Sequence, residues 1–338
     1  MIPRRSAVRQ TPRWQIELAQ AYTDPEALLE ALGLDAGRLL PHARLASRQF
    51  PLRVPKAYVD RMRPGDAADP LLRQVLPLGA ELNPVTGFGP DPVGDRAALR
   101  APGLLHKYAG RVLLNTTPAC AVHCRYCFRR HFPYADAGHG PNTWDAAIDY
   151  IRADVSINEV ILSGGDPLSL SDARLRRLTD GLAGIAHLRR LRIHTRLPIV
   201  LPARVDDGLL SWLEGLPWSP VMVVHCNHPA ELDGPTIDAL KRLRDSGLTL
   251  LNQAVVLAGV NDDADTLVAL SEKLFQAGTL PYYLHLLDRV AGAAHFEVDE
   301  HAATALHAAL RERLPGYLVP RLVREIEGAP SKTPVSAH

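Results

Sequence analysis

Short apolar runs alternate with amphipathic stretches along the second and larger part of the chain. Six runs rich in β-branched and aliphatic residues predict strands, and each is followed by apolar residues at helical spacing. The predicted strands are 112–115, 159–162, 190–195, 221–225, 249–256 and 282–287, and the predicted helices are 143–154, 171–184, 206–214, 233–246, 262–277 and 299–313. Repeated strand–helix units favour an α/β fold built on a parallel sheet, here a partial (β/α)6 TIM-like barrel.

The first hundred residues show a different pattern. Apolar residues at helical spacing over 13–34 predict one or two helices, and the Pro-, Gly- and Asp-rich stretch 65–103 predicts an extended connection. We therefore expect three parts. They are an N-terminal helical and loop-rich appendage (1–103), the barrel (104–314) and a short C-terminal segment (315–338).

Composition narrows the classes of protein to consider. The chain has 338 residues, a formal net charge of +1 and 22% charged residues, so it favours neither nucleic acid nor an anionic membrane as a general partner. No apolar run approaches the roughly 20 residues that span a bilayer, and we expect a cytoplasmic protein. Three of the four cysteines fall within eight residues, which indicates metal chemistry and not a disulfide framework.

Cys120, Cys124 and Cys127 have a CxxxCxxC spacing directly after the first predicted strand, where barrel ligands bind. Three thiolates on one loop can hold three irons of a four-iron cluster and leave the fourth iron open. The open iron can chelate the amino and carboxylate groups of S-adenosylmethionine. The alternative is a structural zinc site, which needs a fourth ligand such as Cys226 or a histidine.

The cysteine spacing, with Tyr126 before the last cysteine, resembles the signature of the radical S-adenosylmethionine (radical SAM) superfamily. Residues 159–167 form a predicted strand ending in a Gly-Gly-Asp-Pro turn, which resembles the superfamily segment that binds the methionine amino group. Glycines permit close backbone approach. The resemblance implies that the S-adenosylmethionine contacts are Tyr126, Ser163, Gly164, Gly165 and Asp166, with His225 and Gln253 lining the adenosyl or cofactor pocket.

Several further segments, from about residue 104 to 335, are similar in sequence and order to the lysine 2,3-aminomutase family. They are Arg-Val-Leu-Leu at 111–114, Cys-Phe-Arg-Arg at 127–130, 194–202, 225–229, 251–253, 259–262, 281–283 with Asp288, and 325–334. The family resemblance implies that Lys332 binds pyridoxal 5'-phosphate as a Schiff base, with Arg111 and Lys107 near that cofactor.

The same resemblance implies a site for free L-lysine. Arg129 would pair with the substrate carboxylate, because a guanidinium matches a carboxylate with two parallel hydrogen bonds. Asp288 and Glu325 would receive the distal ammonium group. Alternatives for these charged side chains are surface ion pairs, and for His225 a buried core histidine.

Within the family the chain is most like the branch that supplies (R)-β-lysine for modification of elongation factor P. It has Lys107 where the family usually has arginine and Glu325 where it has aspartate, and it ends six residues after Lys332 without a cysteine-rich zinc segment. This resemblance implies an isomerase with a flavodoxin or ferredoxin as electron donor, a functional link to the ligase of elongation factor P, and a homo-oligomer. Alternatives are an aminomutase for glutamate or another amino acid, and a zinc-bound protein without catalytic activity.

Overall fold

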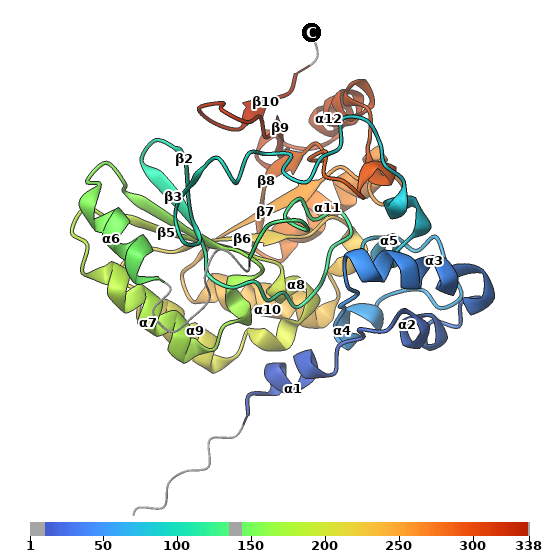
Figure 1. Ribbon diagram of the computed structural model, residues 1–338, viewed down its shortest axis with the longest axis horizontal. Helices are drawn as coiled ribbons and strands as arrows, with labels where there is room; N and C mark the ends of the chain where they lie inside the picture. The colour runs from blue at the N-terminus through green and yellow to red at the C-terminus, as the bar shows by residue number, and fades with distance from the viewer. Residues whose placement is uncertain (1–10, 135–143, 337–338) are drawn as a thin grey trace, which may run out of the picture.

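A computed structural model describes residues 11–134 and 144–336, and its centre is one ten-stranded sheet (Figure 1). The strands lie side by side in chain order, from β1 at one edge to β10 at the other. Their bounds are β1 Leu99–Ala101, β2 Leu104–Tyr108, β3 Arg111–Asn115, β4 Glu159–Ser163, β5 Arg190–Thr195, β6 Val221–His225, β7 Thr249–Val255, β8 Leu280–His285, β9 Arg321–Arg324 and β10 Thr333–Pro334.

Strands β3 to β9 are all parallel, and the pairs β1–β2, β2–β3 and β9–β10 are antiparallel. The six predicted strands correspond to β3–β8, which confirms the partial barrel. The seventh parallel strand, β9, was not predicted. The helices that follow β3 to β8 are α6 Asp145–Ala153, α7 Asp172–Ala183, α8 Leu197–Val200 with α9 Asp207–Glu214, α10 Gly234–Asp245, α11 Ala264–Gln276 and α12 Glu300–Arg313. Apart from α8, which was not predicted, these helices agree with the predicted ones to within a few residues, and position 143 of the first lies outside the described residues.

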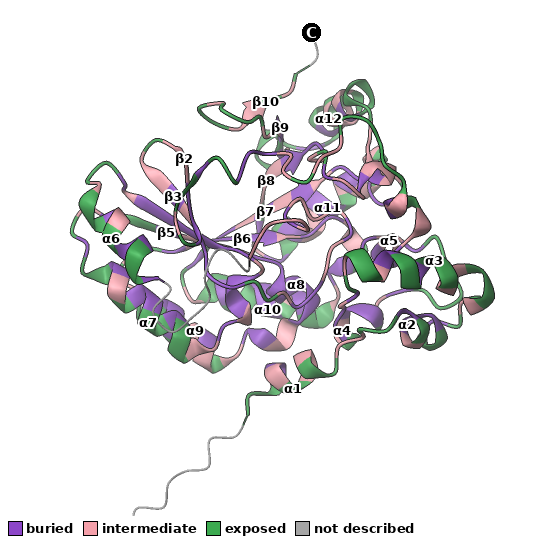
Figure 2. Ribbon diagram, in the orientation of Figure 1, coloured by how far each residue is buried: buried purple, intermediate pink, exposed green. Residues whose placement is uncertain are grey.

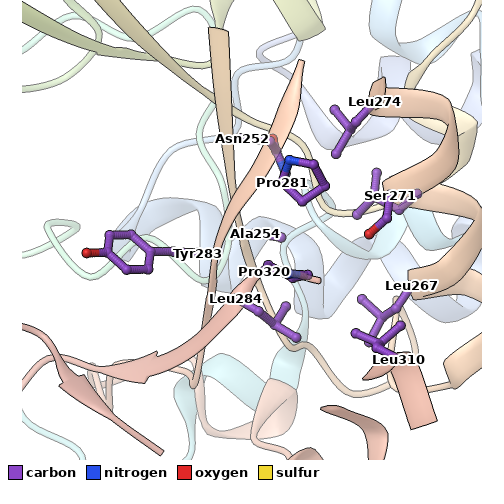
Figure 3. A pocket seen from close by; sticks show the side chains of 11 residues that line it. Asn252, Ala254, Leu267, Ser271, Leu274, Pro281, Tyr283, Leu284, Leu310 and Pro320 are labelled. Carbon is purple, nitrogen blue, oxygen red and sulfur yellow. The ribbon is translucent and has the colours of Figure 1, made fainter. Parts of the chain in front are cut away.

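The two faces of the sheet differ in chemistry because side chains alternate along each strand. Leu162 and Ile193 are partners in the register and are fully buried, toward the helices. His225 and Gln253 are also register partners and lie on the opposite, concave face. Figure 3 shows the same alternation in β8, where the Tyr283 ring points away from Leu284 and from the α11 side chains.

Five short helices precede the barrel and gather on one side of it (Figure 1). They are α1 Arg13–Ala19, α2 Pro25–Ala31, α3 Ala36–Gln49, α4 Lys56–Val59 and α5 Pro70–Arg73, followed by the 3-10 turn η1 Gly79–Leu82. Asp24, Asp35 and Asp69 cap α2, α3 and α5 by accepting backbone N–H bonds. Buried leucines of α2 and α5 belong to the same apolar cluster as the barrel strands. Figure 2 shows that buried residues occur both in the strands and in the helices around them. The sheet and this cluster both cross the boundaries at 103 and 314, so the division into three parts stays a prediction.

Among the described residues, no helix combines the length and the apolar character needed to cross a bilayer.

Candidate active site

The cysteine loop leaves the end of β3 and packs directly on the Gly-Gly turn that leaves β4. The amide of Gly165 donates to the carbonyl of Thr117 (2.6 Å), and the amide of Asp166 donates to that of Ala119 (2.8 Å). A Cβ atom on Gly165 would lie 2.3 Å from the Ala119 oxygen. The close approach that this glycine permits is therefore to the backbone of the cysteine loop.

The Asp166 side chain links the Gly-Gly turn to the loop that follows β5. One carboxylate oxygen accepts from the amide of Leu168 (3.0 Å) and the hydroxyl of Thr195 (2.7 Å). The other accepts from the amides of Arg196 (2.7 Å) and Leu197 (3.2 Å). Burial raises the pKa of Asp166 to about 6, although these hydrogen bonds lower it. Both oxygens thus accept hydrogen bonds from the protein, and the assignment of Asp166 to S-adenosylmethionine stays a prediction.

The three thiols share one environment. Burial raises the pKa of Cys120 and raises that of Cys127 to about 11, and neighbouring cysteines raise both further, so the three sulfur atoms lie near one another. Cys124 accepts a hydrogen bond from the Arg196 guanidinium (2.7 Å). Within residues 11–134 and 144–336, no three Cys, His, Asp or Glu side chains converge closely enough to hold a single metal ion. Thiolates that bind different irons of one cluster need no common point, so these donors fit a four-iron cluster better than zinc.

A buried polar network holds Arg196 against the cysteine loop. The Arg196 guanidinium pairs with Glu231 (2.9 Å) and donates to Gln74 (2.7 Å), and both partners are fully buried. Asn227 donates to the Tyr126 hydroxyl (2.7 Å) and to Gln74 (3.0 Å), so the side chain of Tyr126 ends in this network. Sequence reasoning assigned no role to Arg196 or Asn227, although both lie in segments that resemble the family.

Glu81 of η1 anchors the other end of the cysteine loop. Its carboxylate accepts two hydrogen bonds from Arg125 (2.9 and 2.5 Å) and one from Arg130 (2.7 Å). All three side chains are 0–1% exposed. The Phe50 ring lies within 4.8 Å of both guanidinium carbons. Two arginines on either side of the last cysteine, Cys127, are thus paired by one carboxylate from the N-terminal region.

The concave face carries three imidazoles whose buried Nε2 atoms have no hydrogen-bond partner among the described residues: His194, His225 and His285. Burial lowers the pKa of all three, and that of His225 falls to about 3. Lys332 lowers each pKa further, so its ammonium lies close to them. The Gln253 side-chain oxygen beside His225 is also unpaired. Neutral, unpaired polar groups of this kind fit a polar cofactor between the strands, since buried polar groups are normally satisfied.

Lys332 is linked to the cysteine loop through a continuous chain of charged groups. Its ammonium lies 3.0 Å from Glu325, which is 3.8 Å from the Lys107 ammonium. Lys107 pairs with Asp95 (2.6 Å), and Asp95 pairs with Arg129 (2.7 Å).

Ser163 and Asp95 tie Arg129 into the site. The Arg129 guanidinium donates to the Ser163 hydroxyl (3.1 Å) beside the Gly-Gly turn. Burial opposes ionisation of Asp95, but Arg129 and Lys107 outweigh it and lower its pKa. Asp95 is the residue of this chain of charges that sequence reasoning missed.

The remaining predicted residues surround Lys332. Burial raises the pKa of Asp288 to about 7, Lys332 counteracts this and Glu325 adds to it, so the two carboxylates and the ammonium are neighbours. Tyr108 donates to Glu325 (2.5 Å), and Arg111 covers the Tyr108 ring at 4.7 Å. The pKa of Glu325 is lowered because Lys332 and Tyr108 outweigh its burial.

A small cavity behind β8 is separate from this site (Figure 3). It measures about 10 Å³, close to the room that one water needs, and lies between the sheet and α11. The charged residues described above are not among those that line it.

Comparison with known proteins gives the family. No family model matches the chain. It is 48% identical over 322 residues to the L-lysine 2,3-aminomutase of Escherichia coli, covering 95% of this chain and 94% of that protein. It is 45% identical to the enzyme of the same name from Haemophilus influenzae, over 98% of both chains. With the L-lysine 2,3-aminomutase of Clostridium subterminale it shares 36% identity over 82% of this chain and 67% of the other.

Among solved structures, a radical S-adenosylmethionine methyltransferase from Kitasatospora setae aligns with a TM-score of 0.36 and 16% identity, over 52% of this chain and 36% of its own. That likeness is too distant to carry an argument. The identity and coverage of the aminomutases are sufficient by themselves. The chain belongs to the L-lysine 2,3-aminomutase family of isomerases.

Proposed function

We propose that this protein converts L-α-lysine to (R)-β-lysine with a four-iron cluster, S-adenosylmethionine and pyridoxal phosphate. The observation that supports this most is the chain of charges from Lys332 through Glu325, Lys107 and Asp95 to Arg129. Arg129 lies two residues after Cys127. This series of ion pairs connects the lysine proposed for pyridoxal phosphate with the arginine proposed for the substrate carboxylate, close in sequence to the proposed cluster ligands.

Each cofactor has candidate residues on this chain. Cys120, Cys124 and Cys127 would hold the cluster, and Lys332 would hold pyridoxal phosphate through its Nζ atom, with Arg111 and Lys107 nearby. When bound, the cluster and S-adenosylmethionine supply the radical that removes hydrogen from Cβ, and pyridoxal phosphate supplies the conjugated ring that stabilises the rearranging radical.

The charged residues select the substrate. Asp288 and Glu325 lie beside the Lys332 ammonium, so the same carboxylates can bind a second, substrate ammonium. Arg129 has a planar fork that suits the substrate carboxylate. In the present structure Asp95 occupies one side of that fork and keeps it oriented. A glutamate substrate fits poorly, because its side-chain carboxylate would face Asp288 and Glu325.

The walls of the barrel protect the reaction. A reactive radical must be shielded from water, and the half-buried cysteines and the concave strand face with its three histidines are the parts of this chain that would surround it. His194, His225 and His285 all have lowered pKa values, so at neutral pH they are uncharged. Their role is to solvate polar groups of bound molecules without adding positive charge.

Anaerobic turnover with lysine labelled by ¹⁵N on the α-amino group and ¹³C at Cβ tests this function. Direct ¹⁵N–¹³C bonding in the product, with far less methionine than β-lysine, is the expected result. Methionine formed in proportion to product would indicate an enzyme that consumes S-adenosylmethionine. Isomerisation of glutamate in place of lysine would favour the other aminomutase class.

We further propose that the product serves modification of elongation factor P. The supporting observation is the resemblance to that branch, together with nearly full-length similarity to the Escherichia coli and Haemophilus influenzae relatives. The test is the mass of elongation factor P in a host that lacks its own aminomutase. Adding this chain should produce the β-lysyl form, and a mass unchanged by the added chain would contradict the proposal.

A further inference from the structure

A basic segment runs along the outer side of the cysteine loop. Residues 36–56, which comprise α3 and the first residue of α4, contain five arginines and lysines and no aspartate or glutamate. This is unusual in a chain whose net charge is only +1. The five residues are Arg38, Arg44, Arg48, Arg53 and Lys56, and we call them the basic segment.

Backbone contacts place this segment against the cysteine loop. The amide of His123, one residue before Cys124, donates to the carbonyl of Arg53 (2.9 Å). The His123 ring contacts the carbonyl of Pro51 (2.8 Å) and stacks on the Phe50 ring, with 5.2 Å between centroids. The barrel interior contacts the other side of the loop through Gly165.

Most charges of the basic segment lie at the surface. Arg53 is half-buried, and its guanidinium donates to the Leu18 carbonyl (3.0 Å). Arg38, Arg44, Arg48 and Lys56 are exposed, and Arg44 pairs with Glu26 of α2 (2.5 Å). Arg48 is two residues before Phe50 and Lys56 is three residues after Arg53, and Phe50 and Arg53 both contact His123. The basic segment therefore presents exposed cations close in sequence to its contacts with the cysteine loop.

The neighbouring surface offers space and some apolar area. An open groove of about 600 Å³ lies between α3 and η1. Its lining includes Arg38 and His42 of α3 and residues 77–80, 82 and 83. Leu45 on the exposed side of α3 is 47% accessible. A polar rim around an apolar centre is the usual composition of a protein interface.

We propose that the basic segment is the docking surface for an acidic protein electron donor. This inference rests on the proposed function, since a four-iron cluster must be reduced before it can cleave S-adenosylmethionine. The donor is oxidised by one electron, the cluster is reduced by that electron, and no other group changes. Charge complementarity steers an acidic partner to this face, and docking there places it beside His123, on the side of the loop away from the substrate.

The experiment compares two matched double charge reversals. R48E/K56E changes the basic segment. K241E/R311E changes two exposed cations on α10 and α12, on the outer helices of the barrel. For each protein, the Kd for oxidised flavodoxin is measured calorimetrically from low to high salt, and cluster reduction by reduced flavodoxin is followed by stopped-flow absorbance. Dithionite replaces flavodoxin as a reductant that needs no docking surface.

R48E/K56E is expected to weaken flavodoxin binding by at least about tenfold at low salt and to flatten its salt dependence. K241E/R311E should match the unchanged protein, and all three should form β-lysine equally well with dithionite. Equal losses in the two variants, or none in R48E/K56E, would overturn the docking surface. The docking surface would also be overturned if R48E/K56E lost binding to a nucleic acid while it still bound flavodoxin normally. Failure of all proteins to form β-lysine with dithionite would instead count against the proposed function.

Discussion

Substitution of Gly165 by alanine tests the packing of the cysteine loop against the Gly-Gly turn. The new Cβ would lie 2.3 Å from the Ala119 oxygen and 2.6 Å from the Pro118 oxygen. Carbon atoms pack at about 3.5 Å or more, so one of the two loops must move by about 1 Å. The contacts are with backbone atoms, which cannot rotate away as a side chain would. Overpacking of this kind costs about 1–3 kcal/mol, which corresponds to a fall of several degrees in Tm.

Gly165→Ala should also impair function, because Cys120 follows Ala119 directly. A displacement near 1 Å in an active site typically costs about 100-fold in rate. The assay is iron and sulfide content after anaerobic reconstitution, together with thermal unfolding of the protein before reconstitution. Gly184→Ala is the matched control, since nothing lies within 4 Å of its new Cβ. Normal iron content and normal Tm in Gly165→Ala would refute the packing argument.

Three further predictions concern the charged residues. Lys332→Ala should abolish the long-wavelength absorption of bound pyridoxal phosphate while leaving the iron content unchanged, and an unaltered spectrum would contradict the assignment. Asp288 is mostly neutral below its pKa of about 7 and charged above it, so lysine binding measured calorimetrically should tighten as pH rises through 7. Asp288→Asn should lose that dependence, and retention of it would exclude Asp288 as its source. Glu231→Gln leaves the buried Arg196 cation without its counter-charge, and denaturant unfolding should show a loss of about 3–5 kcal/mol, whereas exposed Glu312→Gln should change little.

The alternation of strands and helices could be predicted from the sequence because each strand is a short apolar run and each helix has apolar residues at a regular helical spacing. Strand β9 was missed because its sequence, Arg-Leu-Val-Arg, is short and has charged ends. It forms because the edge of β8 is open to a parallel partner. Tyr283 of β8 and Arg321 of β9 are register partners there. That edge exists only after the earlier strands have assembled.

The cysteines and Lys332 could be found from spacing and family resemblance, whereas their supporting residues could not. Gln74, Glu81 and Asp95 lie in a Pro- and Gly-rich stretch without periodicity. Each acquires its role through a partner at least 34 positions away, such as Arg129 for Asp95. Local sequence contains no signal for such pairs, because only the fold brings the two side chains together.

The orientation of Asp166 was also beyond sequence reasoning. The Gly-Gly-Asp-Pro segment was recognised, and its aspartate was assigned to S-adenosylmethionine. In the structure its two oxygens accept four hydrogen bonds from the protein, including the amide of Arg196. A motif thus locates the segment, whereas the hydrogen bonds of its aspartate depend on a loop about 30 residues further along the chain.

The measurement that tests the central claim most directly is electron paramagnetic resonance of the reconstituted, reduced protein with and without S-adenosylmethionine. If Cys120, Cys124 and Cys127 leave one iron open, the four-iron signal should shift when S-adenosylmethionine binds that iron. Protein that contains zinc in place of iron, or a cluster signal that S-adenosylmethionine leaves unchanged, would contradict the account.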